Sequence, residues 1–346
     1  MNNYRVDVIA GDGIGLEVVP AAIRCVDALA KKHEFAVTWQ HREWGSEYFR
    51  GHGRMMPTDG LEQLAGADAI FLGAVGVPDI ADTETLWGLL IPIRRTFHQY
   101  VNLRPVRTLP GVESPLRGAE DLDLVIVREN VEGEYSEVGG RTYRGRPEES
   151  AVQESIFTRA GVARIARYAA ELAASRKGVL TSATKSNGIV HTMPFWDEVV
   201  AENAGGVRLE SVLIDALAAR LVLRPTSCDV IVASNLFGDI LSDLAAGVAG
   251  SIGVAPSGNL NPEREYPSMF EPVHGSAPDI AGRGVANPIG QMWAGAMMLE
   301  HLGQPEAAAE LRWAFEGALA DGIRTGDLGG TAGTEEFTDA VLHRMV

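Results

Sequence analysis

The chain contains few cysteines and no long apolar run, and both shortages limit what it can be. Cys25 and Cys228 are the only cysteines among 346 residues, and both lie inside apolar patterns. We therefore expect buried thiols in a reducing compartment, with no disulfide and no cysteine-ligated metal. No apolar segment approaches the length that spans a bilayer, and no signal-peptide pattern precedes the first apolar segment. We therefore expect a cytoplasmic protein without a membrane partner.

Basic residues are also scarce. The chain has 30 Lys and Arg against 46 Asp and Glu, which gives a formal net charge of -16. This balance argues against nucleic acid as a partner. An anionic small molecule would need a local cluster of Arg and Lys. The proportions of 46% hydrophobic and 22% charged residues are typical of a soluble globular protein, and the length is enough for two domains or one large one.

The first glycine-rich turn lacks two parts of a dinucleotide-binding fingerprint. An expected strand at 6–10 leads into Gly-Asp-Gly-Ile-Gly at 11–15, but Leu16 occupies the position of the third glycine. No acidic residue closes a second strand at the required distance. We therefore predict a tight strand-to-helix turn that can border a ligand, and not a Rossmann fold.

Alternating apolar runs and helical stripes predict a mainly parallel α/β architecture. Strands are expected at 6–10, 69–75, 101–106, 122–127, 178–181 and 229–233, and helices up to about 32, from about 84, at 159–174, and after 194, 287 and 305. The segment 133–149, rich in Gly, Tyr and charge, predicts a β-hairpin or arm of the kind that serves in dimers. The segment 247–282 is rich in Gly, Pro and Asn, and we expect a long functional loop there.

One expected helix carries two carboxylates at a spacing that favours a metal ion. It follows the strand at 229–233, with Ser234 or Asn235 as the capping residue. Asp239 and Asp243 are four residues apart, so they lie one above the other beside the apolar stripe. A dipole-stabilising Asp239 with a solvated Asp243 is the simplest alternative, but it leaves Asp243 unexplained. Carboxylate oxygens suit Mg²⁺ or Mn²⁺, and a complete site needs further ligands.

Three arginines lie where an anionic substrate could be bound. Arg94 is near a helix end, Arg104 is on an extended segment, and Arg128 ends a strand. Guanidinium groups form bidentate pairs with carboxylates, so three that converge would suit a dicarboxylate. Taken singly, each is more often a surface or structural arginine.

The contexts of these residues resemble the β-decarboxylating dehydrogenases, the family of isocitrate, isopropylmalate and tartrate/D-malate dehydrogenases. The resemblance extends over essentially all 346 residues, with five motifs in the family's order at 102–105, 128–130, 185–187, 235–244 and 271–280. It implies a two-lobed α/β/α fold with a continuous mixed sheet. Residues 1–99 and 254–346 would form the large cofactor-binding lobe. Residues 100–253 would form the second lobe, with a dimerisation arm at about 133–150 and the metal-binding helix.

The resemblance also implies roles for individual residues. Arg94, Arg104 and Arg128 would hold a 2-hydroxy dicarboxylate, and Tyr135 and Lys185 would be catalytic. Asp215 from a neighbouring subunit would join Asp239 and Asp243 around Mn²⁺ or Mg²⁺, and Lys185 would reach across in the same way. The active unit would then be a homodimer with shared sites. Tartrate-type members also use K⁺. From the residues alone, a solvated Lys185 and a packed Tyr135 are the simpler alternatives.

The family's adenosine-binding loop corresponds here to a segment with small residues that allow close backbone approach. The residues that the resemblance assigns to the cofactor are His274, Gly275, Ser276, Ala277, Asp279 and Asn287. The carboxylate of Asp279 can accept hydrogen bonds from both hydroxyls of an adenosine ribose and would repel a 2′-phosphate. We therefore expect NAD rather than NADP.

Trp87 and Leu90, on the helix before Arg94, are the residues expected to select the substrate. Isopropylmalate dehydrogenases usually have a glutamate at the position of Trp87, whereas the Leu-Trp-Gly sequence resembles the tartrate/D-malate branch. Trp87 would fill the space of an isopropyl group. The resemblance thus implies oxidative decarboxylation of D-malate to pyruvate and CO₂, with oxidation of tartrate as well. The alternatives are a packed Trp87 in a 3-isopropylmalate dehydrogenase, and a non-catalytic protein that binds dicarboxylates or metal.

Overall fold

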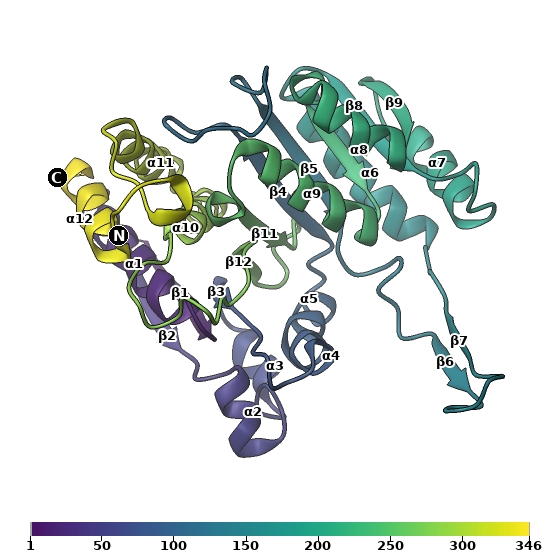
Figure 1. The fold of residues 1–346 in the computed structure, drawn as a ribbon, viewed down its shortest axis with the longest axis horizontal. Coiled ribbons are helices and arrows are strands. Elements are labelled where there is room, and N and C mark those ends of the chain that lie inside the picture. The colour runs from purple at the N-terminus through teal and green to yellow at the C-terminus, as the bar shows by residue number, and fades with distance from the viewer. Residues whose placement is uncertain (1, 346) are drawn as a thin grey trace.

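The computed structural model describes residues 2–345, and its centre is one ten-stranded sheet with helices on both faces (Figure 1). The strand order is β2-β1-β3-β12-β11-β4-β5-β10-β8-β9. Six pairings are parallel and three, around β11 and β4, are antiparallel. The predicted mixed α/β fold is therefore confirmed. The strands are β1 (Asn3–Gly11), β2 (Ala36–His41), β3 (Ala69–Ala74), β4 (Val101–Arg107), β5 (Asp123–Glu129), β8 (Val179–Thr184), β9 (Arg208–Leu213), β10 (Val230–Ala233), β11 (Pro256–Leu260) and β12 (Ser268–Pro272).

The helices mostly follow strands, as expected of an α/β fold. They are α1 (Gly15–Lys32), α2 (Ser46–His52), α3 (Gly60–Leu64), α4 (Asp82–Thr85), α5 (Ile91–Thr96), α6 (Arg159–Ala174), α7 (Thr192–Asn203), α8 (Ile214–Leu223), α9 (Asn235–Ala249), α10 (Ile289–His301), α11 (Pro305–Ala320) and α12 (Thr334–Met345). A π-helical segment, Leu86–Leu90, joins α4 to α5. Within residues 2–345, no helix combines the length and the apolar character that crossing a membrane requires.

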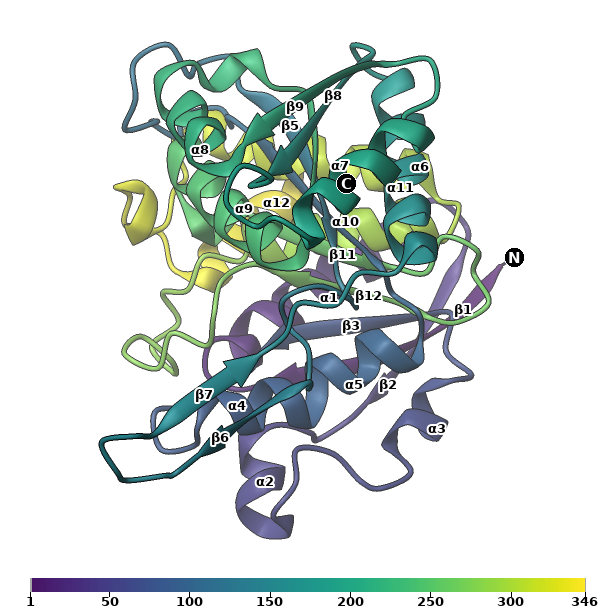
Figure 2. The same cartoon turned by 90° about the vertical axis from the view of Figure 1, so that its right-hand side faces the viewer.

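Period-two alternation along the strands divides the core into two layers. In β3, Ala69 and Phe71 pack with α1, α10, α11 and α12. Ile70 and Leu72 point to the opposite face, where they pack with residues from α3, the π-helical segment and α5. At the other end of the sheet, α8 and α9 lie on one face and α6 and α7 on the other (Figure 2). Both cysteines are buried and unpaired, as expected. The division into lobes at 99/100 and 253/254 stays a prediction.

The expected arm is a β-hairpin that projects from the body of the molecule (Figures 1 and 2). It consists of β6 (Gly139–Thr142) and β7 (Ser150–Gln153), which pair antiparallel. The hairpin is confirmed and extends slightly beyond the predicted range. The role of the hairpin in dimerisation stays a prediction.

The prediction of one long loop at 247–282 is wrong, because β11 and β12 lie inside that segment and are buried throughout. Their sequences, Pro-Ser-Gly-Asn-Leu and Ser-Met-Phe-Glu-Pro, lack the apolar run that marks a central strand. Their polar side chains are buried in a hydrogen-bonded network instead. Asn102 donates to Ser257 and to Asn259, and Asn259 donates to Glu271. Hydrogen bonds between residues so far apart in sequence leave no local signal.

Gly238 allows α9 to pack directly on β5. A Cβ at this position would lie 2.6 Å from Cβ of Arg128. We predict that Gly238→Ala destabilises the protein by about 1–3 kcal/mol, the usual effect of overpacking. The control is Gly247→Ala on the same helix, where a Cβ meets nothing within 4 Å. Because alanine favours helix, that variant should be more stable by about 0.5–1 kcal/mol. Urea unfolding measures both, and equal stability of the two variants would contradict the packing argument.

Candidate active site

Three buried arginines converge at the centre of the sheet. Arg94 comes from the last turn of α5, Arg104 from β4 and Arg128 from β5. Their exposed fractions are 5%, 7% and 2%. Burial, with a smaller contribution from the neighbouring guanidinium charges, lowers the pKa of Arg104 and brings that of Arg128 to about 9. Buried like charges at this spacing need anionic partners.

Asp239 on α9 is the carboxylate that the arginines share. Its Oδ1 lies within ion-pair distance of both Arg128 and Arg104, the latter at 3.3 Å. Burial alone would raise the pKa of Asp239, but Arg128 and Arg104 bring it below its ordinary value. Asp243, one turn later, lies 3.4 Å from Arg104 and is more exposed, and burial raises its pKa.

The start of α9 differs from the prediction. Ser234 occupies the N-cap position, but its side chain accepts no hydrogen bond from the helix. Instead, its hydroxyl donates to Oε1 of Glu134 at 2.7 Å, and the backbone N–H of Leu236 donates to Oε2 at 3.0 Å. The carboxylate of Glu134 therefore caps the helix and offsets its positive end. Sequence reasoning missed this residue because it lies about 100 positions away, although it directly precedes Tyr135.

Arg94 has a carboxylate partner of its own. Its Nη2 donates to Glu271 at 2.9 Å, and Nε is buried without a partner. A buried unpaired donor is unfavourable, so this guanidinium still has capacity to bind an acceptor. Sequence reasoning quoted Glu271 only as part of a motif and did not assign it to the site.

Neutral groups hold the other two guanidiniums in place. Arg104 donates to Asn102 and Ser242, and Arg128 donates twice to Asn235. These partners were also missed. They carry no charge, and nothing in the sequence pairs them with a particular arginine.

Tyr135 belongs to the same cluster. Its hydroxyl donates to Oδ2 of Asp239 at 2.9 Å, and the guanidinium of Arg128 lies 5.5 Å from its ring centroid. Burial and the charge of Asp239 raise the pKa of Tyr135. The phenol therefore stays protonated at neutral pH, as a proton donor must.

Lys185 and Asp215 form a separate pair. Their side chains are 2.7 Å apart, and the carboxylate of Asp215 is largely exposed. Across residues 2–345, no three His, Cys, Asp or Glu side chains gather as one metal site. Asp239 and Asp243 both lie within ion-pair distance of Arg104, and their hard oxygen donors would suit Mg²⁺ or Mn²⁺. A third ligand to such an ion is not among the neighbouring side chains that the structure describes in the same chain. Asp215 of a second subunit stays the predicted one.

The two expected selectivity residues lie on the π-helical segment. The ring of Trp87 contacts the guanidinium of Arg95, whose Cζ is 5.0 Å from the ring centroid. Leu90 packs against the apolar layer formed by Leu89 and Ile93. Neither was predicted to lie on a π-helix, and such segments are frequent at functional sites.

The loop after β12 borders a cavity of about 470 Å³ that suits part of a nucleotide. Ile14, His274, Ala277 and Asn287 line it, with Asp327, a residue that sequence reasoning did not find. Nδ1 of His274 lies 3.0 Å from the carbonyl oxygen of Gly275 and so donates to it. Burial lowers the pKa of His274, so Nε2 is a neutral acceptor, and it is buried without a partner. An exocyclic amino group could donate to it, which fits adenine.

The first glycine-rich turn packs against this loop. The N–H of Ile14 donates to the carbonyl of Ser276 at 2.9 Å, and a Cβ on Gly13, where φ is +54°, would lie 2.0 Å from that oxygen. The turn therefore borders the cavity through Ile14, and its contact with a ligand stays a prediction. Gly275 and Asp279 belong to the same loop, and Asp279 is exposed.

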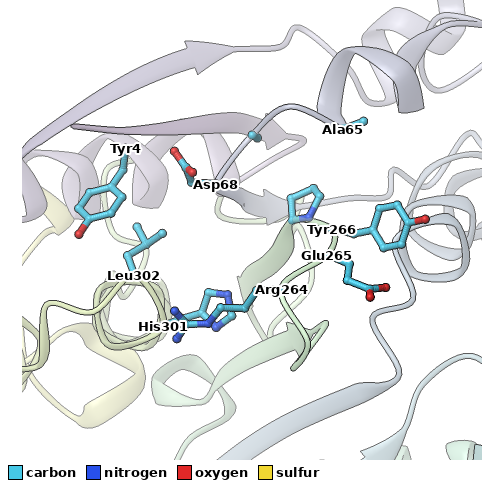
Figure 3. Close-up of a pocket in the computed structure, with 10 residues that line it drawn as sticks. Tyr4, Ala65, Asp68, Arg264, Glu265, Tyr266, His301 and Leu302 are labelled. Carbon is cyan, nitrogen blue, oxygen red and sulfur yellow. The ribbon is translucent and has the colours of Figure 1, made fainter. Parts of the chain in front are cut away.

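A second cavity, of about 230 Å³, is shown in Figure 3. It is lined by Tyr4, Asp68, Arg264 and His301 among others. Tyr4 and Asp68 lie at the beginnings of β1 and β3, whereas the glycine-rich turn follows the end of β1. This cavity is therefore not part of the candidate site.

The chain is similar to known proteins over nearly its whole length. The family model described as isocitrate/isopropylmalate dehydrogenase matches residues 5–341. The D-malate dehydrogenase (decarboxylating) of Escherichia coli is 53% identical over 354 residues, covering 99% of this chain and 98% of that protein. The tartrate dehydrogenase/decarboxylase of Pseudomonas putida is 51% identical, covering 98% and 97%. The isocitrate dehydrogenase of Methylococcus capsulatus superposes with a TM-score of 0.89 at 31% identity, over 99% of both chains.

Replacing Asp239 tests the metal assignment. Asp239→Asn keeps the shape of the side chain but removes its charge. We predict that affinity for Mn²⁺ falls by at least about tenfold, since even outer partners of metal ligands are worth about 10–100-fold. Calorimetric titration with Mn²⁺ measures this, with Asp121→Asn in an exposed loop as the control. Unchanged affinity in Asp239→Asn would exclude Asp239 as a ligand.

Proposed function

Because this chain belongs to the isocitrate/isopropylmalate dehydrogenase family, we propose that it is an NAD- and divalent-metal-dependent enzyme that converts D-malate to pyruvate and CO₂ and also oxidises tartrate. Two relatives about half identical over the full length are named for these substrates. The observation that carries the proposal is the buried cluster of three arginines around Asp239 and Tyr135. It combines binding capacity for two carboxylates with a protonated phenol.

The arginines bind and orient the substrate. Nε of Arg94 has no partner in its buried position, and the charges of Arg94 and Arg104 are near enough to act on Arg128. The two carboxylates of a C4 acid would accept hydrogen bonds from these guanidiniums. Burial strengthens these pairs because water does not compete.

Mn²⁺ or Mg²⁺, held by Asp239, Asp243 and the partner's Asp215, would lower the pKa of the substrate hydroxyl and polarise the ketone that forms. The cavity beside His274 and Asn287 would hold the adenosine of NAD, which accepts the hydride. The resemblance to tartrate-type members of the family implies K⁺ as well, so K⁺ is a further cofactor to test.

The proton transfers fall to two side chains. Lys185 takes the hydroxyl proton as hydride leaves C2, which yields a 2-oxo acid. The C3–C4 bond then breaks, CO₂ departs, and the electron pair stays on C3 as an enolate. Tyr135 gives its proton to C3 to complete pyruvate. Its hydrogen bond to Asp239 fixes the position of the phenol, and its raised pKa keeps the proton available.

Lys185 and Asp215 contact one another, and within residues 2–345 Asp215 does not join Asp239 and Asp243 in one metal site. We infer a homodimer in which each subunit supplies this pair to its partner. Val222, Leu223 and Ile240, on the adjoining helices α8 and α9, are exposed apolar side chains that such an interface would cover. Two reduced thiols and the absence of a spanning helix in residues 2–345 support a cytoplasmic location.

A substrate panel tests the proposal. NADH formation is followed with D-malate, L- and meso-tartrate, 3-isopropylmalate and isocitrate, with Mn²⁺ and with EDTA. We predict a kcat/KM for D-malate at least about tenfold above that for 3-isopropylmalate, within the 1–3 kcal/mol that such pockets discriminate. EDTA should abolish activity.

The other outcomes of the panel are as informative. A higher kcat/KM for 3-isopropylmalate would identify a leucine-pathway enzyme instead. Full activity in EDTA would contradict the metal requirement. No NADH from any substrate would favour the non-catalytic binding protein.

Asp279 tests the cofactor preference. Its carboxylate would accept from the ribose hydroxyls of NAD and repel the 2′-phosphate of NADP. We predict that the wild-type protein has a higher kcat/KM with NAD than with NADP. In Asp279→Asn the ratio of the two values should fall by about tenfold, which corresponds to about 1.36 kcal/mol. Measuring kcat/KM with both cofactors decides this. An unchanged ratio would mean that Asp279 does not contact the ribose.

A further inference from the structure

Arg95 follows Arg94 directly but has a different set of partners. Its guanidinium lies 5.0 Å from the ring centroid of Trp87. Its Nη2 donates to the backbone carbonyl of Tyr135 at 2.8 Å, and its Nη1 pairs with Glu137 at 2.7 Å. Arg94 pairs with a buried carboxylate, whereas Arg95 contacts an aromatic ring, a backbone carbonyl and the exposed carboxylate of Glu137. The two neighbouring arginines therefore have different surroundings.

The π-helical segment explains how Arg95 reaches Trp87. The two residues are eight positions apart, which in a regular α-helix would offset them by about 80° around the axis. A π-helical turn contains about one residue more than an α-helical turn. Around the helix axis, Arg95 therefore has the position that the seventh residue after Trp87 would have in a regular α-helix. Seven residues at about 100° each complete roughly two turns, so the two side chains lie on the same side. Long helical side chains also lean toward the N-terminus, which brings the guanidinium over the ring.

The carbonyl that Arg95 binds belongs to a segment that is fixed on its other side. Tyr135 donates to Asp239 through its hydroxyl, and Glu134 caps α9. The segment is therefore attached to α9, whereas Trp87 lies on the π-helical segment that continues into α5. Arg95 connects these two elements through one stacked and one hydrogen-bonded contact. Glu137 contributes less, because its side chain is 71% exposed and water competes for it.

We propose that Arg95 is a positioning residue that sets the spacing between Trp87 and Tyr135 and so contributes to substrate selection. This inference rests on the proposed function, in which Trp87 excludes large substituents at C3 and Tyr135 protonates that carbon. A ring held under a fixed guanidinium cannot turn aside for an isopropyl group. Without Arg95, the ring gains rotamers, and the backbone of Tyr135 loses a donor.

The test uses Arg95→Lys and Arg95→Met in the full-length enzyme. Lysine keeps the charge but lacks the plane that stacks on a ring and the fixed fork of N–H donors. We expect the ratio of kcat/KM for D-malate to that for 3-isopropylmalate to fall by about tenfold in both variants, the size of a stacked cation contact. KM for D-malate should change less than about threefold, because the three buried arginines remain, while kcat falls as the phenol is displaced.

A double-mutant cycle separates positioning from a general loss of stability. In a Trp87→Phe background the stack is already weakened. Arg95→Lys should then lower the ratio of kcat/KM for D-malate to that for 3-isopropylmalate by less than about threefold, as expected of coupled residues. Two controls are Arg50→Lys, on the exposed surface of α2, and Glu137→Gln; both should leave the ratio within twofold of wild type.

Two results would overturn the inference. One is a ratio that stays within twofold of wild type in both Arg95 variants. The other is an equal fall in kcat/KM for both substrates with additive effects in the cycle, as a purely structural role predicts. The wild-type panel tests the proposed function separately, because the Arg95 inference depends on the change of the ratio and not on which substrate is preferred.

Discussion

The burial of three guanidinium groups within reach of one another is the constraint around which the centre of this molecule is arranged. Their mutual repulsion is stronger there than in water, and burial together with the neighbouring guanidiniums lowers the pKa of Arg128 to about 9. Asp239, Asp243 and Glu271 lie within ion-pair distance of these groups and offset the three positive charges. A dianionic ligand would therefore bind best where a cation on Asp239 and Asp243 frees guanidinium donors for it.

The same contacts hold the strands and helices in register. Arg104 and Arg128 lie on the antiparallel pair β4 and β5, and α9 can approach them closely because residue 238 is glycine. Glu134 then caps α9 and places Tyr135 against Asp239. Packing and catalysis therefore depend on one set of distances, and a change in helix position would alter both.

Local patterns predicted those parts of the fold that local physics determines. The apolar run of β3 and the helical stripe of α6 were found because burial there follows from period and composition. Strands β11 and β12 were missed because their polar side chains are buried by bonds to distant residues. Spacing alone likewise found Asp239 and Asp243, whereas Glu134 and Glu271 became visible only when the chain was folded. The contact between Arg95 and Trp87 depends on a π-helical turn that no residue pattern predicts.

Asp239 makes the binding events in this site interdependent. One oxygen pairs with Arg128 and Arg104, and the other accepts from Tyr135. A cation on this carboxylate would compete with the guanidiniums, whose donors would then turn to the substrate carboxylates. The cation would in this way strengthen substrate binding. By linkage, the substrate must then strengthen cation binding by the same factor. The charge of Asp239 also acts on the phenol, so the proton on Tyr135 is held most tightly before a cation binds and is released more readily afterwards. In the proposed enzyme, one carboxylate would thus couple substrate binding, metal binding and proton transfer.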